Sequence, residues 1–330
     1  MKAIQIKVTG GPEVLELVDI ARPVPAPGEV LVRSVAIGVG KPDVLMRTGA
    51  YRWMPPLPAT PGAEMTGIVE ALGDGVAAQH PQLRVGVPVL VYHLKGRGYA
   101  EFAAVPAADV TPLPDSIDLD AAVSIPNYQV AWALIYRAAR GVDIRSVYVN
   151  GAAGGIGSAV IQLCKVAGFK LIGGAGSAAK CAFAMAQGAT HAIDYSRENV
   201  VERVLELTNG EGVDLILDHV VGKNFTDSLD MLGNMGMIVS FNALGGTPEK
   251  ELFREMRAHL PKSPAVRCFT MHAYDHDPVG KRQVRDTVLD LFARGLVHPP
   301  IHDRLPLGEA RRAHELLDAR AVMGKLLLEP

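Results

Sequence analysis

A glycine cluster at positions 150–157, which reads N-G-A-A-G-G-I-G, is the clearest candidate for a binding site in this sequence. The cluster follows an apolar run at 147–149 that is typical of a buried strand, and it leads into an amphipathic segment at 156–167 that we expect to be a helix. A glycine-rich turn between strand and helix lets the backbone approach a phosphate, and the helix dipole favours the negative charge. The pattern predicts a dinucleotide-binding turn, with a ligand-free chain reversal as the simpler alternative.

Within the cluster, residues 152–157 align with the fingerprint G-x-G-x-x-G, except that Ala152 stands in the place of the first glycine. A small residue there still permits the tight turn, Gly154 lets the backbone approach a pyrophosphate, and Gly157 permits close contact between helix and strand. The residues of this turn that we predict to bind the cofactor are Ala153, Gly154, Gly155, Ile156 and Gly157.

The segment expected to hold the adenine-side ribose contains no acidic residue. An NAD site places an aspartate or glutamate about 20 residues after the first glycine, where it binds the ribose 2′-hydroxyl. Residues 172–180 here read I-G-G-A-G-S-A-A-K. Without a carboxylate nothing repels a 2′-phosphate, and Ser177 and Lys180 could bind it directly, although a solvated surface position is the simpler interpretation of Lys180. The sequence therefore predicts NADPH as the cofactor.

The elements that must position these residues follow from the apolar pattern. After about residue 121, strand-like runs alternate with helical segments, which is typical of βαβ units and a parallel sheet. The expected strands are 147–149, 170–172, 192–194, 213–217 and 237–241, and the expected helices are 156–167, 178–187, 200–208 and 224–232. Before residue 121, short apolar runs between glycine and proline turns predict an irregular β-rich domain. Beyond about residue 264 the chain is expected to be irregular again, and then to form helices at 280–295 and 309–319 and a strand at 325–328 that returns to the first domain.

Composition excludes several classes of protein. The 330 residues carry 33 lysines and arginines and 35 aspartates and glutamates, a formal net charge of −2 that disfavours binding to nucleic acid or to an acidic membrane surface. The three cysteines are far apart, which disfavours a disulfide framework. The first residues lack the apolar core of a secretion signal, and no membrane span is expected. We therefore expect a cytoplasmic globular protein.

The chain also resembles a known family, the zinc-free quinone oxidoreductase (zeta-crystallin-like) branch of the medium-chain dehydrogenase/reductase superfamily. The resemblance runs nearly end to end, and its motifs occur in the family's order. The segments that carry it are 10–15, the motif Asp43-x-x-x-Arg47-x-Gly49-x-Tyr51, 61–69, 152–157, Asp194-Tyr195, 213–222 and 314–325.

The resemblance implies an α/β fold with two domains and a cofactor cleft between them. A Rossmann doubly wound parallel sheet, residues 122–264, would bind NADPH, and a GroES-like β-rich catalytic domain would be built from residues 1–121 and 265–330. The family also suggests a homodimer formed through the Rossmann domain, with residues 267–270 as a candidate contact.

The resemblance further implies which side chains surround the cofactor. It places Ser177, Lys180 and Tyr195 around the adenosine 2′-phosphate. The other positions that it places along the nucleotide are Pro42, Asp43, Val130, His219, Val220, Phe241, Gly324 and Lys325. Asp43 is also expected to anchor its own loop through Arg47.

We predict no metal site. Zinc-dependent relatives carry a cysteine where Gly40 stands and a histidine where Ala63 stands, and neither residue here can bind zinc. A histidine–aspartate patch at 272–277 follows no familiar ligand spacing and is interpreted as a polar loop. Without zinc no Lewis acid lowers the pKa of an alcohol, so the chemistry of a zinc alcohol dehydrogenase is disfavoured.

Hydride transfer requires the nicotinamide and an electrophilic carbon to be held about 3–3.5 Å apart in a dry cleft. Negative charge then develops on the acceptor oxygen, where a hydrogen-bond donor would stabilise it. The candidate donors are Tyr51, Asn127 and Lys41. Each has a simpler alternative role: Tyr51 could cap a loop, Asn127 could bind backbone groups, and Lys41 could face solvent.

The sequence departs from the family pattern at Gly40, Leu45 and Val130, where an asparagine, a tyrosine and a threonine are common. The main hypothesis is an NADPH-dependent oxidoreductase that transfers a hydride to a quinone or an α,β-unsaturated carbonyl. The alternative is an NADPH-binding protein with a mainly non-catalytic role, either structural or RNA-associated.

Overall fold

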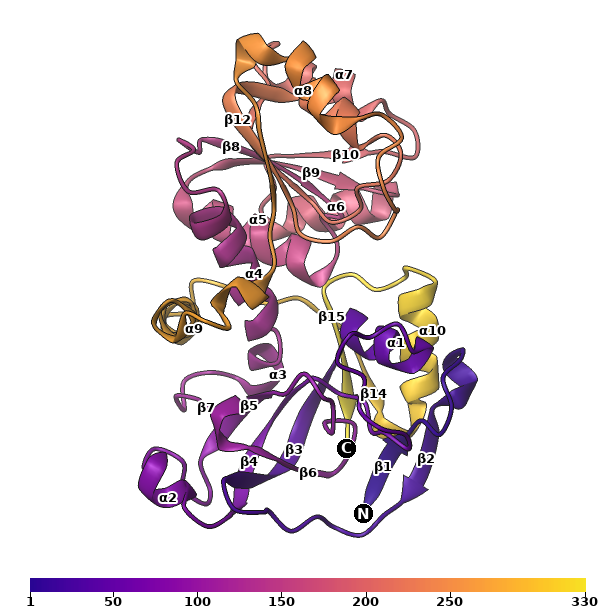
Figure 1. Cartoon of the computed structure of the whole chain (residues 1–330), viewed down its shortest axis with the longest axis vertical. Coiled ribbons are helices and arrows are strands. Elements are labelled where there is room, and N and C mark those ends of the chain that lie inside the picture. The colour runs from indigo at the N-terminus through magenta and orange to yellow at the C-terminus, as the bar shows by residue number, and fades with distance from the viewer. The chain divides into compact units, whose positions relative to one another are not determined.

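The computed structural model describes residues 1–330, and the chain folds into two compact units (Figure 1). Unit 1 comprises residues 1–126, 292–294 and 299–330, and unit 2 comprises residues 127–291 and 295–298. Both chain ends therefore belong to unit 1. None of the helices combines the length and the apolar character that a bilayer crossing requires.

Unit 1 is built on a seven-stranded sheet in the order β14-β15-β3-β4-β5-β7, with β6 paired to β3. Its strands are β3 (Glu29–Val39), β4 (Glu64–Leu72), β5 (Pro88–Tyr92), β6 (Phe102–Pro106), β7 (Val110–Pro112), β14 (Ile301–Pro306) and β15 (Lys325–Glu329), beside a β1 (Lys2–Gln5) and β2 (Glu16–Asp19) pair. Its helices are α1 (Lys41–Thr48), α2 (Val76–Gln79), α3 (Leu119–Ala122) and α10 (Ala310–Asp318). The predicted return of the last strand is confirmed, because β15 pairs with β3.

Unit 2 holds a six-stranded parallel sheet in the order β10-β9-β8-β11-β12-β13. The strands are β8 (Ser146–Asn150), β9 (Lys170–Ala175), β10 (His191–Asp194), β11 (Val213–Asp218), β12 (Leu232–Ser240) and β13 (Ala265–Cys268). This is the 3-2-1-4-5-6 order of the Rossmann fold, so the predicted fold class is confirmed. Helices α5 (Gly155–Ala167) and α6 (Ala178–Gln187) cover one face, and α7 (Val200–Leu207) and α8 (Leu252–Ala258) the other (Figure 1). The chain also forms α4 (Ile125–Ala133) and α9 (Pro278–Ala293).

Two of the expected elements were wrong. The helix expected at 224–232 is only a short 3₁₀ turn at Phe225–Leu229, because Leu232 already pairs with Val213 as the first residue of β12. The irregular stretch expected after residue 264 begins instead with β13, which pairs with β12. The boundary expected between residues 264 and 265 therefore differs from the structure, which keeps residues up to 291 in unit 2. A four-residue strand at a sheet edge leaves too short an apolar pattern to be recognised from sequence.

A buried ion pair fastens the sheet of unit 1. Glu64 begins β4 and Lys325 begins β15, on either side of β3, and their side chains form a salt bridge. Both side chains are almost entirely shielded from solvent, with 11% and 5% exposed. The Lys325 side chain also passes over Gly38, where an added Cβ would lie 2.8 Å from its Cε atom. Removing one partner would leave an uncompensated charge in the interior.

We predict that Lys325→Met lowers the free energy of unfolding by about 3 kcal/mol, because Glu64 loses its counter-charge in a buried position. The matched control is Lys2→Met, which breaks the exposed pair between Lys2 and Asp19 and should cost less than about 1 kcal/mol. Urea denaturation of the two variants measures the difference. Equal losses would contradict a buried role for the Lys325 pair.

Candidate functional site

The glycine cluster of unit 2 forms a tight turn between β8 and α5. Gly151 has a φ of +73°, a backbone region that favours glycine, and its carbonyl accepts a hydrogen bond of 3.0 Å from the Gly154 amide. The left-handed residue of the turn is therefore Gly151, one position before the segment aligned with the fingerprint. Ala152 follows it fully buried, and its amide donates to the carbonyl of Gly174 in β9.

Helix α5 begins with backbone amides that remain available for a ligand. Its cap residue, Gly154, has extended backbone and no side chain to accept the amides of Gly155, Ile156 and Gly157. An added Cβ at Gly154 would meet only the Gly151 carbonyl, at 3.5 Å, so this approach to the helix is open. At Gly157 an added Cβ would lie 2.3 Å from the same carbonyl, which shows how closely the helix packs on the turn. The free amides at the start of α5 thus fit a phosphate group of a dinucleotide.

The end of the next strand gathers the residues expected around the 2′-phosphate. Ser177 caps α6, where its hydroxyl oxygen accepts a 3.3 Å hydrogen bond from the Lys180 amide. The exposed Tyr195 lies against Gly176, since an added Cβ there would be 2.9 Å from the tyrosine hydroxyl oxygen. The carboxylate of Asp194, beside Tyr195, accepts from the amide and hydroxyl of Ser196. Residues 172–180 themselves carry no acid.

The loops after β11 and β12 bring His219, Val220 and Phe241 to the same carboxyl edge of the sheet. The rings of His219 and Phe241 have centroids 5.6 Å apart. Burial lowers the pKa of His219, against the raising effects of the Asp218 charge and of a hydrogen bond with the Asn150 backbone. The imidazole is therefore neutral at pH 7.

Two further expected residues of unit 2 belong to helix α4. Asn127 and Val130 lie on this helix, and both are half-buried.

In unit 1 the carboxylate of Asp43 is buried and accepts three backbone amides. One oxygen of Asp43 accepts from the amides of Gly62 and Ala63 at 2.9 and 3.1 Å, and the other accepts from Gly40 at 2.9 Å. Burial, followed by the charge of Glu64, raises the Asp43 pKa to about 6, against the lowering effects of the hydrogen bonds of Gly40 and Gly62 and of the charge of Lys325.

Asp43 anchors its loop through these backbone amides. The expectation that it does so through Arg47 was wrong, since that guanidinium binds Asp318 at 2.8 Å.

Tyr51 is the buried candidate donor of unit 1. Its hydroxyl is buried without a hydrogen-bond partner. Burial, with the Asp43 charge, raises its pKa to about 12, so the hydroxyl keeps its proton at neutral pH. Lys41 is exposed at the first position of α1, and Pro42 follows it.

The last two expected residues of unit 1 have local structural roles. Gly324 has a φ of +81°, and an added Cβ would lie 2.3 Å from the Pro300 carbonyl. Lys325 binds Glu64, as described above. Sequence reasoning did not single out Glu64 as a partner of Lys325; the only signal was an acid at the first position of the strand Glu64–Leu72.

The histidine–aspartate patch at 272–277 forms local contacts. His272 binds Asp275 at 2.9 Å on the surface, and Asp277 accepts from the Gly280 amide near the start of α9. The structure contains no group of three or more histidine, cysteine, aspartate or glutamate side chains that could hold a metal ion.

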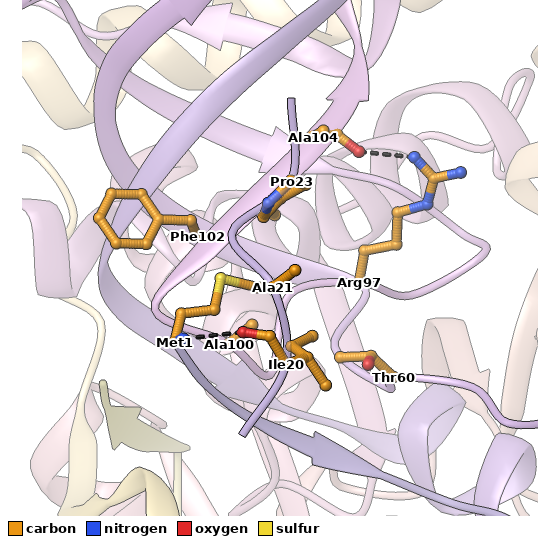
Figure 2. Close-up of a pocket in the computed structure, with 10 residues that line it drawn as sticks. Met1, Ile20, Ala21, Pro23, Thr60, Arg97, Ala100, Phe102 and Ala104 are labelled. Atoms are coloured by element: carbon orange, nitrogen blue, oxygen red, sulfur yellow. Dashed lines mark hydrogen bonds between the residues drawn. The ribbon is translucent and has the colours of Figure 1, made fainter. Parts of the chain in front are cut away.

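A small pocket of unit 1 lies apart from all of these residues. Its volume is about 200 Å³, and its lining residues are Met1, Ile20, Ala21, Pro23, Thr60, Arg97, Ala100, Phe102, Ala103 and Ala104. Figure 2 shows the Arg97 side chain along one wall, where its guanidinium donates to the Ala104 carbonyl at 2.6 Å. None of the expected site residues lines it.

Two family models match separate parts of this chain. Residues 26–115 match the alcohol dehydrogenase GroES-like domain, and residues 155–293 match the zinc-binding dehydrogenase family. A quinone oxidoreductase of Pseudomonas aeruginosa is 34% identical, over 100% of this chain and 99% of that protein. The rat quinone oxidoreductase is 31% identical, over 99% of this chain and 97% of that protein.

The chain belongs to the quinone oxidoreductase branch of the medium-chain dehydrogenase/reductase superfamily. Among solved structures of the family, the quinone oxidoreductase of Escherichia coli complexed with NADPH has a TM-score of 0.89 and 30% identity, over 100% of both chains. A Pseudomonas syringae quinone oxidoreductase has a TM-score of 0.88 and 33% identity, over 100% of this chain and 99% of that one. The predicted resemblance and fold are confirmed. These relatives are described as oxidoreductases, so the alternative of a non-catalytic nucleotide-binding protein finds no support.

The raised pKa of Asp43 predicts an unusual pH dependence. Because the folded-state pKa of about 6 exceeds the usual 3.8, the folded protein binds this proton more tightly than the unfolded chain does. The contribution of Asp43 to stability should therefore fall by about 2–3 kcal/mol as the pH rises from about 4 to about 6, and stay low above pH 6. Urea denaturation across this range should show the fall for the wild type but not for Asp43→Asn, whose side chain does not titrate. Parallel curves for the two proteins would contradict the prediction.

Proposed function

We propose that this chain is an NADPH-dependent oxidoreductase that reduces quinones or other α,β-unsaturated carbonyl compounds, and that it works without zinc. The observation that carries the proposal is the carboxylate-free end of β9, where Ser177 caps α6, Lys180 lies in its first turn and Tyr195 lies against Gly176. In the sheet β9 is the neighbour of β8, which leads into the open amino end of α5. The names of the relatives support the same activity, and two solved relatives are described as complexed with NADPH.

The chain's own residues would hold the cofactor in two places. The amides of residues 155–157 would bind its pyrophosphate, and Ser177 and Lys180 would bind the 2′-phosphate with a hydroxyl and a positive charge. His219, Val220 and Phe241 would line the nucleotide at the ends of β11 and β12. When bound, NADPH supplies the hydride for the reduction.

Reduction of a carbonyl or quinone places negative charge on the acceptor oxygen, and the protein's task is to stabilise it. We assign the main donor to Tyr51, because its buried hydroxyl retains its proton and has no partner within the protein. Asn127 and Lys41 are the other candidate donors. Water would supply the final proton, since no acid is free for this task among the candidates.

The proposal that zinc is not required rests on the side chains at two positions. Gly40 and Ala63 stand where zinc-dependent members carry ligands, and neither has an atom that binds zinc. The neighbouring carboxylates are engaged, since Asp43 accepts three backbone amides and Glu64 binds Lys325. Metal analysis of purified, active protein tests this, and stoichiometric zinc would overturn it.

A kinetic screen tests the activity and the cofactor together. We expect NADPH oxidation, followed by its absorbance in stopped flow, with at least one member of a panel of quinones and enones.

Lys180→Ala should lower kcat/KM for NADPH by about tenfold or more and leave kcat/KM for NADH nearly unchanged, because NADH lacks the phosphate that the lysine binds. No turnover across the panel would overturn the activity, and a wild-type preference for NADH would overturn the role of Lys180.

Tyr51→Phe tests the donor. Loss of the hydroxyl should lower kcat by about 10–100-fold, because the developing charge loses a hydrogen bond. Stability should not fall, since the hydroxyl has no partner in the folded protein. Steady-state kinetics and urea denaturation give the two readouts. Unchanged kcat would remove Tyr51 from the mechanism, and joint loss of stability and activity would indicate a structural role.

We also propose a homodimer formed through the edge of the unit 2 sheet. β13 is an edge strand, and Arg267 and Cys268 on it are exposed. The Phe269 amide donates to β12, so by strand alternation the Cys268 amide faces away from the sheet.

Cys268→Pro should remove this outward donor and give a monomer in light scattering, whereas Cys268→Ser should remain a dimer. A dimeric proline variant would contradict the proposed interface.

We further propose that the protein works in the cytoplasm. Its three cysteines are free thiols, and burial raises the pKa of the Cys164 thiol to about 12. Free thiols suit a reducing compartment.

A further inference from the structure

The loop that follows β11 holds a branched residue in an unfavourable backbone conformation. Val221 has a φ of +58°, and it is the only β-branched residue among the six non-glycine residues with positive φ. A branched Cβ makes this left-handed region costly, so neighbouring contacts must impose it. Backbone strain of this kind is concentrated at binding and active sites.

Two sets of contacts hold this conformation. The backbone of the loop exchanges hydrogen bonds with Leu244, Gly245 and Gly246, and the carboxylate of Asp218, the last residue of β11, also binds the loop. The Asp218 side chain is buried, and one oxygen accepts from the Val221 amide at 3.1 Å. The other oxygen accepts from the Val220 amide at 2.8 Å and from the Asn150 side chain, at the end of β8, at 3.2 Å. One carboxylate thus ties the loop to the strand that enters the glycine turn.

The loop held by Asp218 presses His219 against that turn. An added Cβ at Gly151 would lie 2.2 Å from the His219 Cε1 atom, so the imidazole lies directly on this glycine. The Gly151 carbonyl accepts from the Gly154 amide, and it also lies against Gly157. The contacts therefore run without a gap from Asp218, through His219 and Gly151, to the first turn of α5.

We propose that Asp218 is a positioning residue for the dinucleotide. By holding Val221 in the left-handed conformation and binding Asn150, it keeps the His219 ring on Gly151 and fixes the turn that presents the α5 amides. The inference rests on the proposed NADPH binding, and it adds a residue outside the glycine fingerprint on which that binding depends.

The same strand provides a matched control at its other end. Asp214 accepts from the amides of Arg145 and Ser146 at 2.9 and 2.8 Å, and from the Ser146 hydroxyl at 2.9 Å. Like Asp218, it joins β8 and β11 through one carboxylate, but it lies at the amino end of the parallel strands. Ligands of such sheets bind at the carboxyl ends, so Asp214 shares the structural role and lacks the positioning role.

The experiment compares Asp218→Asn with Asp214→Asn. The dissociation constant for NADPH is measured by titration calorimetry, and the melting temperature is measured without nucleotide. Both variants should melt at lower temperature than the wild type, and only Asp218→Asn should bind NADPH about tenfold more weakly. Equal affinities in the two variants would overturn the proposal. A wild type that binds no NADPH would overturn the proposed function, and this inference with it, which is a distinguishable result.

A rescue variant tests the physical cause. Glycine adopts positive φ without strain, so the double variant Asp218→Asn with Val221→Gly should bind NADPH at least about fivefold more tightly than Asp218→Asn alone.

If Asp218→Asn does not fold, His219→Phe and His219→Ala provide the comparison. The phenyl ring still covers Gly151, so the phenylalanine variant should bind NADPH about fivefold more tightly than the alanine variant. Failure of the rescue, or equal affinities of the two His219 variants, would overturn the positioning role.

Discussion

Much of unit 2 depends on one steric requirement, the close approach of backbone to backbone at the start of α5. Gly151 lies under an imidazole and Gly157 against a carbonyl, and Gly154 leaves the helix terminus open. A side chain at any of these positions would push the helix away from the strand or block its amides. The parallel strand order places the carboxyl ends of β8, β9, β11 and β12 side by side around this point, so the candidate residues that follow these strands lie at one edge of the sheet.

The two units use the same device to shape irregular backbone. In each, a buried aspartate accepts several hydrogen bonds from backbone or side-chain amides and so joins segments that are distant in sequence. Asp43 draws together the segments at 40 and 62–63, and Asp218 draws together Asn150 and the loop at 220–221. Such bonds need no particular side chain on the donor residue, so the residues between the anchors are free to vary with the chemistry of the site.

The family resemblance covers the whole chain, yet the chemistry of the site lies in a few positions. The family model matched by residues 155–293 is named for zinc binding, but Gly40 and Ala63 carry no ligating atom. A fold can host more than one reaction when such positions change, because the backbone that binds the nucleotide does not depend on them. The assignment of a donor to Tyr51 follows from its buried, unpaired hydroxyl, which the fold alone does not imply.

The sequence by itself determined the class of fold, the place of the glycine turn between β8 and α5, and the absence of an acid at the end of β9. These follow from short-range patterns: apolar periodicity, glycine spacing and the type of one residue at one distance. Only the tertiary structure decided that Gly151 takes the left-handed conformation of the turn, that Lys325 binds Glu64, and that β13 joins the unit 2 sheet. The physical reason is that each of these depends on contacts between segments far apart in the sequence, and no local pattern records which segments will meet.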